Sequence, residues 1–489
     1  MTLLLLVPIL GPLAAAAVAA AVGWRRLSAS VTVLGAVSVL VAGIVLGFGV
    51  SSGSRFGVGH LLRADALSVT MLIVIGTVGT LATWASLGYI NAELAHGHTD
   101  RPGAHRYGVL VPLFLAAMAL AVLANNAGVM WAAIEATTVA TAFLVGHRRT
   151  RAALEATWKY VIICSVGIAL AFLGTVVLYF ASLHAGAPSA HALEIDVLLS
   201  HAAAFNPAVT HLAAGLLLLG YGAKAGLVPF HTWLADAHSQ APAPVSALMS
   251  GVLLSVAFYA LLRVKSILDL ALGVGFMRIG LVIVGLLTLL IATSLLIVQT
   301  DFKRMLAYSS MENMGLVAVA AAAGTELAIA ALLLHVLAHG VGKAVLFLSA
   351  GQLQAAHDST AIIDVTGVLS RSRLIGTAFA VGLLVLLGLP PFAMFASELS
   401  ISRALADAHL AWPLGAALLL VLIGFAALVR NGSRMLLGPP APNAPTIAVP
   451  GSVAAALLTG ITVSVALGVT AGPLTHLFHS AAAVLGAAG

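Results

Sequence analysis

The chain is 489 residues long, 61% hydrophobic and only 8% charged, with a mean hydropathy of +1.11. This composition excludes a soluble globular protein of this size and predicts a polytopic membrane protein. The net charge of +6 does not indicate a nucleic-acid-binding protein, because the Lys and Arg residues are scattered singly or in pairs across short loops. The single cysteine, Cys164, excludes disulfides and Cys-ligated clusters and argues against a thiolate zinc site.

Fourteen segments are apolar enough over about 20 residues to cross a membrane as helices. No basic residue precedes the first segment, and Arg25 and Arg26 follow it, so we expect a retained helix rather than a cleaved signal peptide. The predicted fold class is an all-α polytopic membrane protein. The segments are 3–23, 29–50, 66–90, 107–124, 128–146, 157–181, 209–239, 243–262, 276–299, 306–323, 327–350, 373–408, 411–430 and 449–471.

Two of these segments, 209–239 and 373–408, are too long for one straight crossing, and each contains a break. The breaks have similar sequences, GLVPF at 226–230 and GLPPF at 388–392. Proline removes a backbone donor and frees a carbonyl in the preceding turn. The two segments are the seventh and the twelfth in order, so they cross in opposite directions. This arrangement favours inverted-topology repeats, in which broken helices build an ion site near the middle of the membrane.

The distribution of basic residues predicts the orientation of the chain. If the loop with Arg25 and Arg26 is cytoplasmic, thirteen Lys and Arg residues outside the helices lie on that side and six on the other. This imbalance predicts a multi-pass protein of the cell's inner (plasma) membrane with both termini on the outer side. The six residues are Arg55, Arg63, Arg263, Lys265, Arg278 and Arg403. The remaining cations, which fall within or at the edge of helices, are Lys159, Lys224 and Lys343.

Two of the buried ionisable residues are predicted to act together. Lys224 lies two residues before the first break, and Glu135 lies in an otherwise uncharged helix, VMWAAIEATTVATAFLVG. A charged residue inside a membrane helix costs roughly 2.5–3.5 kcal/mol on insertion scales, so one that persists usually has a partner and a function. Glu135 could instead be a helix-end carboxylate that reaches water, but it lies well inside the helix that follows Asn126. We therefore expect Glu135 and Lys224 to form an ion pair that opens to release a proton.

His335, His339 and Lys343 are spaced four residues apart in LLLHVLAHGVGKAVLFL. This spacing places all three on one stripe of a helix, about 6 Å apart along its axis. Histidine titrates near neutral pH and exchanges protons at both ring nitrogens, so the stripe can pass protons. An isolated histidine commonly only hydrogen-bonds a neighbour, but three aligned polar groups favour a hydrated path. Haem ligation is disfavoured, because few other buried histidines are suitably placed in a second helix.

Three further residues are candidates. Glu398 follows the second break in LGLPPFAMFASELSIS, where an acid beside a hydrated break could be a proton exit or, alternatively, a carboxylate at the outer surface. Lys159, in ATWKYVIICSVG, lies near a helix start and could either reach water or tune a neighbouring acid. His231 and Asp236 follow the first break, where they could cap a helix or admit protons from the cytoplasm.

At these motifs the chain resembles the antiporter-like membrane subunits of respiratory complex I, of membrane-bound group 4 hydrogenases and of multisubunit cation/proton antiporters. The matching blocks, between about residues 65 and 430, are Glu135, Lys224 with GLVPFHTWLADAHSQAPAPVSAL, DFKRMLAYSS, LHVLAHGVGKAVLFLSAG and Glu398. PPFAMFASELSI and AHSQAPAPVSALMSG are most similar to the F-type membrane subunit of hydrogenase-4. The chain departs from the family at Ser250 and Ser255, where relatives carry a Lys or His, so the middle of a relay would depend on water.

The resemblance implies about 14 transmembrane helices built on two inverted five-helix repeats. Residues 1–106 would hold helices 1–3 and residues 431–489 a C-terminal transmembrane helix. The repeats would occupy 107–262, with a break around 224–230, and 263–430, with a break around 388–392. The resemblance also implies a proton path from Glu135 and Lys224 through central His and Lys residues to a terminal Lys or Glu.

The sequence thus predicts a proton-translocating membrane subunit of a respiratory-type oxidoreductase complex, hydrogenase-4-like or NADH-quinone oxidoreductase-like. We expect no cofactor, no metal and no catalytic centre in this chain, because it carries no cluster, flavin or nucleotide motif. The expected partners are other membrane subunits, a peripheral redox arm with hydrogenase-like or quinone-reducing subunits, and the lipid bilayer, but no nucleic acid. The alternatives are a subunit of a multisubunit Na⁺/H⁺ antiporter, a redox carrier that binds haem or quinone, and a solitary solute carrier.

Overall fold

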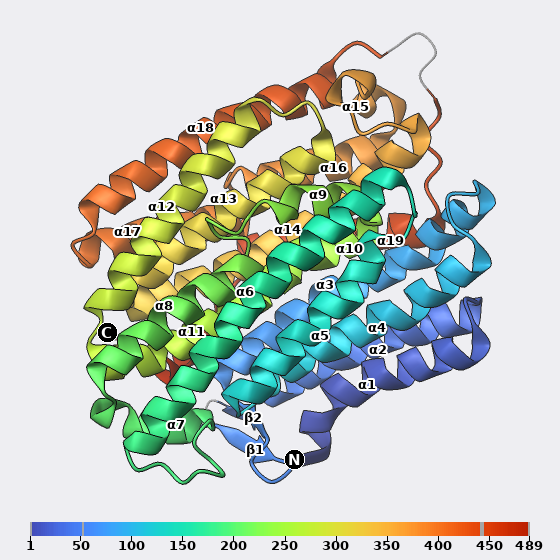
Figure 1. Cartoon of the computed structure of the whole chain (residues 1–489). Helices are drawn as coiled ribbons and strands as arrows, with labels where there is room; N and C mark the ends of the chain where they lie inside the picture. The colour runs from blue at the N-terminus through green and yellow to red at the C-terminus, as the bar shows by residue number, and fades with distance from the viewer. Residues whose placement is uncertain (1, 51–52, 441–444, 488–489) are drawn as a thin grey trace.

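The computed structural model describes residues 2–50, 53–440 and 445–487. Its helices pack side by side with roughly parallel axes into one bundle (Figure 1). A short antiparallel hairpin of β1 (Arg55–Gly57) and β2 (Leu62–Ala64), which the sequence did not predict, lies at one end of the bundle. The helical elements are α1 (Thr2–Val22), α2 (Arg26–Gly47), α3 (Ala66–Ala95), α4 (Arg101–Leu123), α5 (Ala127–Val145), α6 (Arg151–His184), α7 (Ile195–His201), η2 (Ala202–Ala204), α8 (Pro207–Lys224), α9 (Trp233–Gln240), α10 (Ala243–Leu248), η3 (Met249–Leu253), α11 (Leu254–Leu272), α12 (Gly275–Ile297), α13 (Phe302–Ala323), α14 (Glu326–His357), η4 (Ile362–Asp364), α15 (Val368–Arg371), α16 (Arg373–Leu386), α17 (Ala393–Asp407), α18 (Ala411–Leu437), α19 (Gly451–Val469) and α20 (Gly472–Val484).

The predicted all-α polytopic fold class is confirmed. Each of the fourteen predicted segments corresponds to a helix or to consecutive helices. Among the described residues, 11 helical spans are long and apolar enough to cross a membrane, judged by length and composition. The other three predicted segments correspond to α8 with α9, to α13, and to α16 with α17.

Several predicted helix ends are displaced, because helices such as α4, α11 and α18 continue past their apolar cores into polar residues. The predicted domain limits at 106, 262 and 430 fall inside these three helices, and the division into domains stays a prediction. The C-terminal region holds a short helix, α20, in addition to the predicted transmembrane helix α19. DFKRMLAYSS, one of the blocks that carry the resemblance, is almost wholly the first part of α13, with Asp301 as its N-cap.

Both predicted helix breaks are present. The chain leaves α8 at Lys224 and resumes in α9 at Trp233, and it leaves α16 at Leu386 and resumes in α17 at Ala393. Each break turns on a glycine with positive φ, +79° at Gly226 and +59° at Gly388, a region that glycine enters without steric cost. The shared geometry agrees with two related halves, and their inverted arrangement stays a prediction.

A third interruption, between α10 and α11, was not predicted from the sequence. These helices are joined by the π-helical turn η3, which contains Ser250 and Gly251. Gly251 packs against Gly340 of α14 so closely that a Cβ on it would lie 2.9 Å from the Gly340 carbonyl oxygen. Single π turns inside α-helices are frequent at functional sites. This turn therefore marks the contact of α10–α11 with α14 as a candidate functional region.

The core of the bundle lies along α10–α11 and α14, whose apolar windows are buried over 100% and 94% of their residues, against 28% for α18 and α19. The buried ionisable side chains of the candidate site belong to this centre. They are Lys224, His238, His335, His339 and Lys343.

A buried ionic cluster joins α3 to α11. Arg263 donates to Asp65 Oδ1 at 2.5 Å and to Ser68 Oγ at 2.9 Å, and Arg63 Nε lies 3.0 Å from Asp65 Oδ2. Burial alone would raise the pKa of Asp65, but Arg263 and Arg63 lower it to about 2. The sequence places Arg63 and Arg263 in loops, whereas both are buried in this cluster.

Candidate functional site

Lys224 is the last residue of α8, and its side chain is completely buried. Its Nζ donates hydrogen bonds to Thr138 Oγ1 at 2.9 Å and to Tyr160 OH at 2.6 Å. Trp233, at the start of α9, donates its indole N–H to Ala223 O at 3.0 Å and so ties the two sides of the break together. The broken helix thus holds a buried ammonium group against two hydroxyl groups.

Glu135 lies on α5, one helical turn before Thr138, and is half-buried. In the described structure its Oε2 is buried without a hydrogen-bond partner, and no ion pair within 4.0 Å joins Glu135 to Lys224. The predicted ion pair is therefore not formed in this conformation, and its role as a switch stays a prediction. The Thr138 hydroxyl, which accepts from Lys224, lies next to the Glu135 carboxylate. A proton exchanged between the two groups would pass by way of this hydroxyl.

His238 on α9 is a functional candidate that the sequence analysis missed. Its ring is completely buried, and within the described structure neither ring nitrogen has a hydrogen-bond partner. The ring stacks on Phe347, with centroids 5.5 Å apart, and lies 6.4 Å from Trp233. Phe347 is one turn from Lys343 on α14, so the imidazole lies between the first break and that lysine. Its place in the block DAHSQAP, just after the break, was the available signal.

Lys343 on α14 is completely buried and is bound by α13. Its Nζ donates to Leu306 O at 2.6 Å and to the Ser309 hydroxyl. Like Lys224, it has no acidic oxygen within 4.0 Å in the described part of the chain. The second lysine is therefore also an ammonium group held by neutral oxygens.

A hydrogen-bonded series continues from Lys343 to His335 along α13. Asn313 Nδ2 donates to Ser309 O at 2.7 Å, and Asn313 Oδ1 lies 2.9 Å from His335 Nε2. On the other side of the ring, His335 Nδ1 lies 3.0 Å from Ser397 Oγ, whose hydroxyl also donates to Met394 O at 2.7 Å. Asn313 Nδ2 and the Ser397 hydroxyl already donate to backbone carbonyls, so Asn313 Oδ1 and Ser397 Oγ accept hydrogen bonds from the imidazole ring. His335 can therefore hold a proton on each nitrogen.

His339 does not join Lys343 to His335 as the predicted stripe requires. Its ring lies parallel to that of His335 at a centroid distance of 6.4 Å, and its Nε2 is buried without a partner among the described residues. The spacing correctly places the three side chains on one buried face of α14. The bridging groups, however, come from Ser309 and Asn313 on the neighbouring helix, which sequence spacing within α14 does not reveal.

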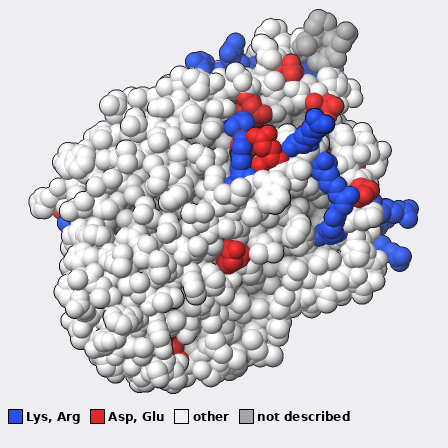
Figure 2. Space-filling model, viewed as in Figure 1, with Lys and Arg blue, Asp and Glu red and all other residues white. Residues whose placement is uncertain are grey.

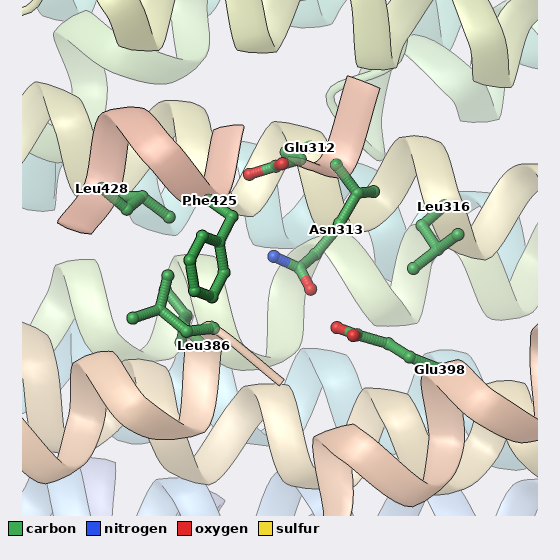
Figure 3. Close-up of a pocket in the computed structure, with 9 residues that line it drawn as sticks. Glu312, Asn313, Leu316, Leu386, Glu398, Phe425 and Leu428 are labelled. Carbon is green, nitrogen blue, oxygen red and sulfur yellow. The ribbon is translucent and has the colours of Figure 1, made fainter. Parts of the chain in front are cut away.

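Glu398 on α17 points back toward the second break. A Cβ placed on Gly388 would lie 2.2 Å from Glu398 Oε2, so the glycine of the break leaves the space that this carboxylate occupies. Glu398 lines a pocket together with Asn313 and a second acid, Glu312 (Figure 3). Since Asn313 also contacts His335, the pocket lies at the end of the hydrogen-bonded series.

Ser250 and Ser255, the two serines at which the resemblance implies a departure from a relay residue, differ in their contacts. Ser250, in η3, shares a hydrogen bond of 2.6 Å with Ser310 of α13. The hydroxyl of Ser255 is buried without a partner in the described structure. Among the described residues, neither serine hydrogen-bonds a charged group.

Lys159 and His231 lie apart from this series. Lys159 Nζ is on the surface, 2.6 Å from Glu155 and 3.1 Å from Asp236, and Asp236 also pairs with Arg304 at 2.8 Å. Asp236 thus links α9 to α6 and α13. His231 is half-buried in the first break, and its Nδ1 has no partner in the described residues. No group of three or more His, Cys, Asp or Glu residues in the described part of the chain could hold a metal ion.

Comparison with known proteins assigns the chain to a family. Residues 124–424, which contain every candidate from Glu135 to Glu398, match the transmembrane family of NADH:quinone oxidoreductases and Mrp antiporters. The chain belongs to this family. A hydrogenase-4 component F homolog of Methylacidiphilum infernorum is 36% identical over 343 residues, covering 70% of this chain and 71% of that protein. Three other curated relatives are longer, and the chain spans 55% to 57% of their length. The resemblance inferred from the motifs is confirmed.

Two solved structures share the fold. A chain of the membrane-bound sulfane sulfur reductase, an archaeal respiratory membrane complex, matches with a TM-score of 0.88 at 22% identity, covering 100% of this chain and 98% of its own. A chain of the Mrp complex from Dietzia sp. DQ12-45-1b matches with a TM-score of 0.87 at 22% identity, covering 99% and 98%. The family member described here is therefore an antiporter-like, multi-pass membrane subunit of the kind found in multisubunit respiratory-type complexes.

Proposed function

We propose that this chain is the proton-translocating membrane subunit of a redox-driven complex of the hydrogenase-4 or NADH-quinone oxidoreductase type. The observation that supports it most is the hydrogen-bonded series from Lys343 through Ser309 and Asn313 to His335. Buried ionisable groups inside a membrane bundle are costly and mark ion pathways. The hydrogenase-4 component F homolog supports the type of complex.

The proposed path starts at Glu135 and Lys224, passes His238 and Lys343, and reaches His335 and Glu398. A movement that brings Glu135 against Lys224 would favour the charged lysine, and the reverse movement would release its proton toward His238. In this proposal the two groups, which form no ion pair here, are in the open form of the switch. Moving one charge against 100 mV takes roughly 2.3 kcal/mol, which closing and opening one buried ion pair can supply.

The partners would supply the redox chemistry. We propose that other membrane subunits and a peripheral arm with hydrogenase-like or quinone-reducing subunits drive the movement, while this chain holds no cofactor of its own. The membrane would be the cell's inner membrane, with both termini on the outer side. Lys, Arg, Asp and Glu gather at one end of the bundle face in Figure 2, which supports an asymmetric orientation. Burial of Arg63 and Arg263 reduces the exposed positive charge at the other end.

The proposal is tested with the intact complex in sealed vesicles, by counting the protons translocated per electron. Lys224→Ala and Glu135→Gln should each lower this ratio by roughly the 10²-fold that a positioned acid–base group contributes. Arg403→Gln is the control, because Arg403 is 78% exposed and its one ion pair with a described residue is to Asp407 on its own helix. Undiminished translocation in both variants would overturn the proposal. Sodium movement in place of proton movement would support the alternative, a Na⁺/H⁺ antiporter subunit, which the likeness to the Mrp chain raises.

A further inference from the structure

The pocket beside the second break contains an acid that the proposed path does not use. Glu312 on α13 is only 5% exposed and lines the pocket that Glu398 and Asn313 also line. In Figure 3 the Asn313 side chain lies between the two carboxylates, and Phe425 and Leu428 close the pocket on the side of α18. Two acids from different helices therefore face one small space at the end of the hydrogen-bonded series.

Glu312 has no partner of its own in the described structure, since it makes neither a hydrogen bond nor an ion pair there. The charged groups that act on it are Lys343 of α14 and Glu398 of α17, and the walls contributed by α16 and α18 are apolar. An unpaired carboxylate inside a membrane bundle is costly unless it takes up a cation. The unpaired Glu312 carboxylate therefore indicates that the ligand of the pocket is a small cation.

Glycines provide the room for both acids. A Cβ on Gly424 of α18 would lie 2.0 Å from Glu312 Oε1, and one on Gly388 would lie 2.2 Å from Glu398 Oε2. Gly415, on the same helix as Gly424, faces open space. The close fit at Gly424 and Gly388 shows that the pocket is shaped around the two carboxylates.

We propose that Glu312 and Glu398 form one coupled terminal proton site, in which the proton that arrives by way of His335 resides on one carboxylate or the other, on either side of Asn313. Two carboxylates that line one pocket do not both ionise readily, so the pair holds one proton in common. Its release toward the outer side leaves the pair ready for the next proton. The inference rests on the proposed path and adds Glu312 to it as a second acceptor.

The direct test is infrared titration of the carboxyl groups in the purified complex, in H₂O and D₂O. If the acids share a proton, Glu312→Gln should move the midpoint of the remaining Glu398 band by about one pH unit or more, and Glu398→Gln should move that of Glu312 likewise. Glu326→Gln is the matched control, because that acid is 43% exposed and pairs with His479. An unchanged Glu398 midpoint in Glu312→Gln would overturn the shared site.

A second variant tests the same site without removing an acid. Gly424→Ala should displace Glu312 and slow proton translocation about tenfold, the factor that one pH unit of coupling represents. Gly415→Ala, on the same helix, should leave translocation unchanged. Equal translocation by the two alanine variants would contradict the shared site. The infrared coupling is measured without turnover, so it tests the shared site separately from the proposed path. The coupling can be absent while Lys224→Ala still lowers translocation, which overturns the shared site alone. The coupling can also be present while Lys224→Ala leaves translocation unchanged, which overturns the path alone.

Discussion

Two groups of buried charged side chains in this chain have different kinds of partner. In the cluster between α3 and α11, Arg263 and Asp65 are in contact at 2.5 Å, and Arg63 adds a second cation. In the middle of the bundle, Lys224 and Lys343 are equally buried, but within the described structure they donate only to hydroxyl and carbonyl oxygens. A carboxylate partner fixes a lysine or arginine in its charged form, whereas neutral oxygens allow a lysine to lose its proton. Pairing, rather than burial, therefore separates the structural charges from those proposed to move protons.

The largest expected effect is on the structural side of this comparison. Asp65→Asn leaves Arg263 buried without a carboxylate, and breaking a buried pair in this way costs about 3–5 kcal/mol. We expect the free energy of unfolding in detergent to fall by that amount, while the folded fraction still translocates protons at the wild-type ratio. Denaturant unfolding measures the first quantity and vesicle assays the second. Asp407→Asn, in an exposed pair, is the control.

Acid should reproduce this loss of stability. The pKa of Asp65 is lowered from its usual 3.8 to about 2, so the carboxylate stabilises the fold fully above 3.8. That contribution is lost as the pH falls through about 2. Equal unfolding of Asp65→Asn and wild type at neutral pH would show that the cluster is not structural.

A smaller effect is expected where a neutral oxygen holds a lysine. Tyr160→Phe removes one of the two hydroxyl groups bound to Lys224, and a hydrogen bond to a charged group contributes about 1.5–3 kcal/mol. Proton translocation should fall roughly tenfold or more, since 1.4 kcal/mol corresponds to that factor. Tyr221→Phe is a matched control on α8, because its buried hydroxyl has no partner among the described residues. Identical rates in the two variants would remove Tyr160 from the site.

The smallest effect is expected at an exposed pair. Lys159 bonds Glu155 and Asp236 at the surface, and Asp236 keeps Arg304 when Lys159 is replaced. Exposed pairs contribute less than about 1 kcal/mol. Lys159→Gln should therefore leave both stability and proton translocation close to wild type. A loss of proton translocation as large as that of Lys224→Gln would show that Lys159 takes part in the proton path.

Much of the fold was predictable because its determinants are local. A run of about 20 apolar residues is sufficient to indicate a membrane helix, and Gly226 with Pro229 indicates the first break. The π turn η3 and the hairpin of β1 and β2 were not predicted, because neither has a composition that differs from its surroundings. Helix ends such as that of α11 were misplaced for a related reason: the helices continue beyond their apolar residues.

The candidate site was predictable in its ionisable residues but not in its connections. Spacing alone places His335, His339 and Lys343 on one face of α14. It does not show that Ser309 and Asn313 bridge Lys343 to His335, because that contact depends on how α13 packs against α14. The place of Thr138 beside Lys224 was missed for the same reason, since sequence does not show that its hydroxyl accepts from the lysine.

The central claim is that Lys343 and His335, which Asn313 positions against α13, belong to one proton path. The most direct measurement is the number of protons translocated per electron by the intact complex in vesicles carrying Asn313→Ala. Asn431→Ala is the matched control, because Asn431 is an equally buried asparagine on α18 whose Nδ2 has no partner in the described structure. The account predicts a loss of about tenfold or more for Asn313→Ala, which removes two hydrogen bonds of the series, and a ratio close to wild type for Asn431→Ala. Equal ratios in the two variants, with electron transfer intact, would contradict it.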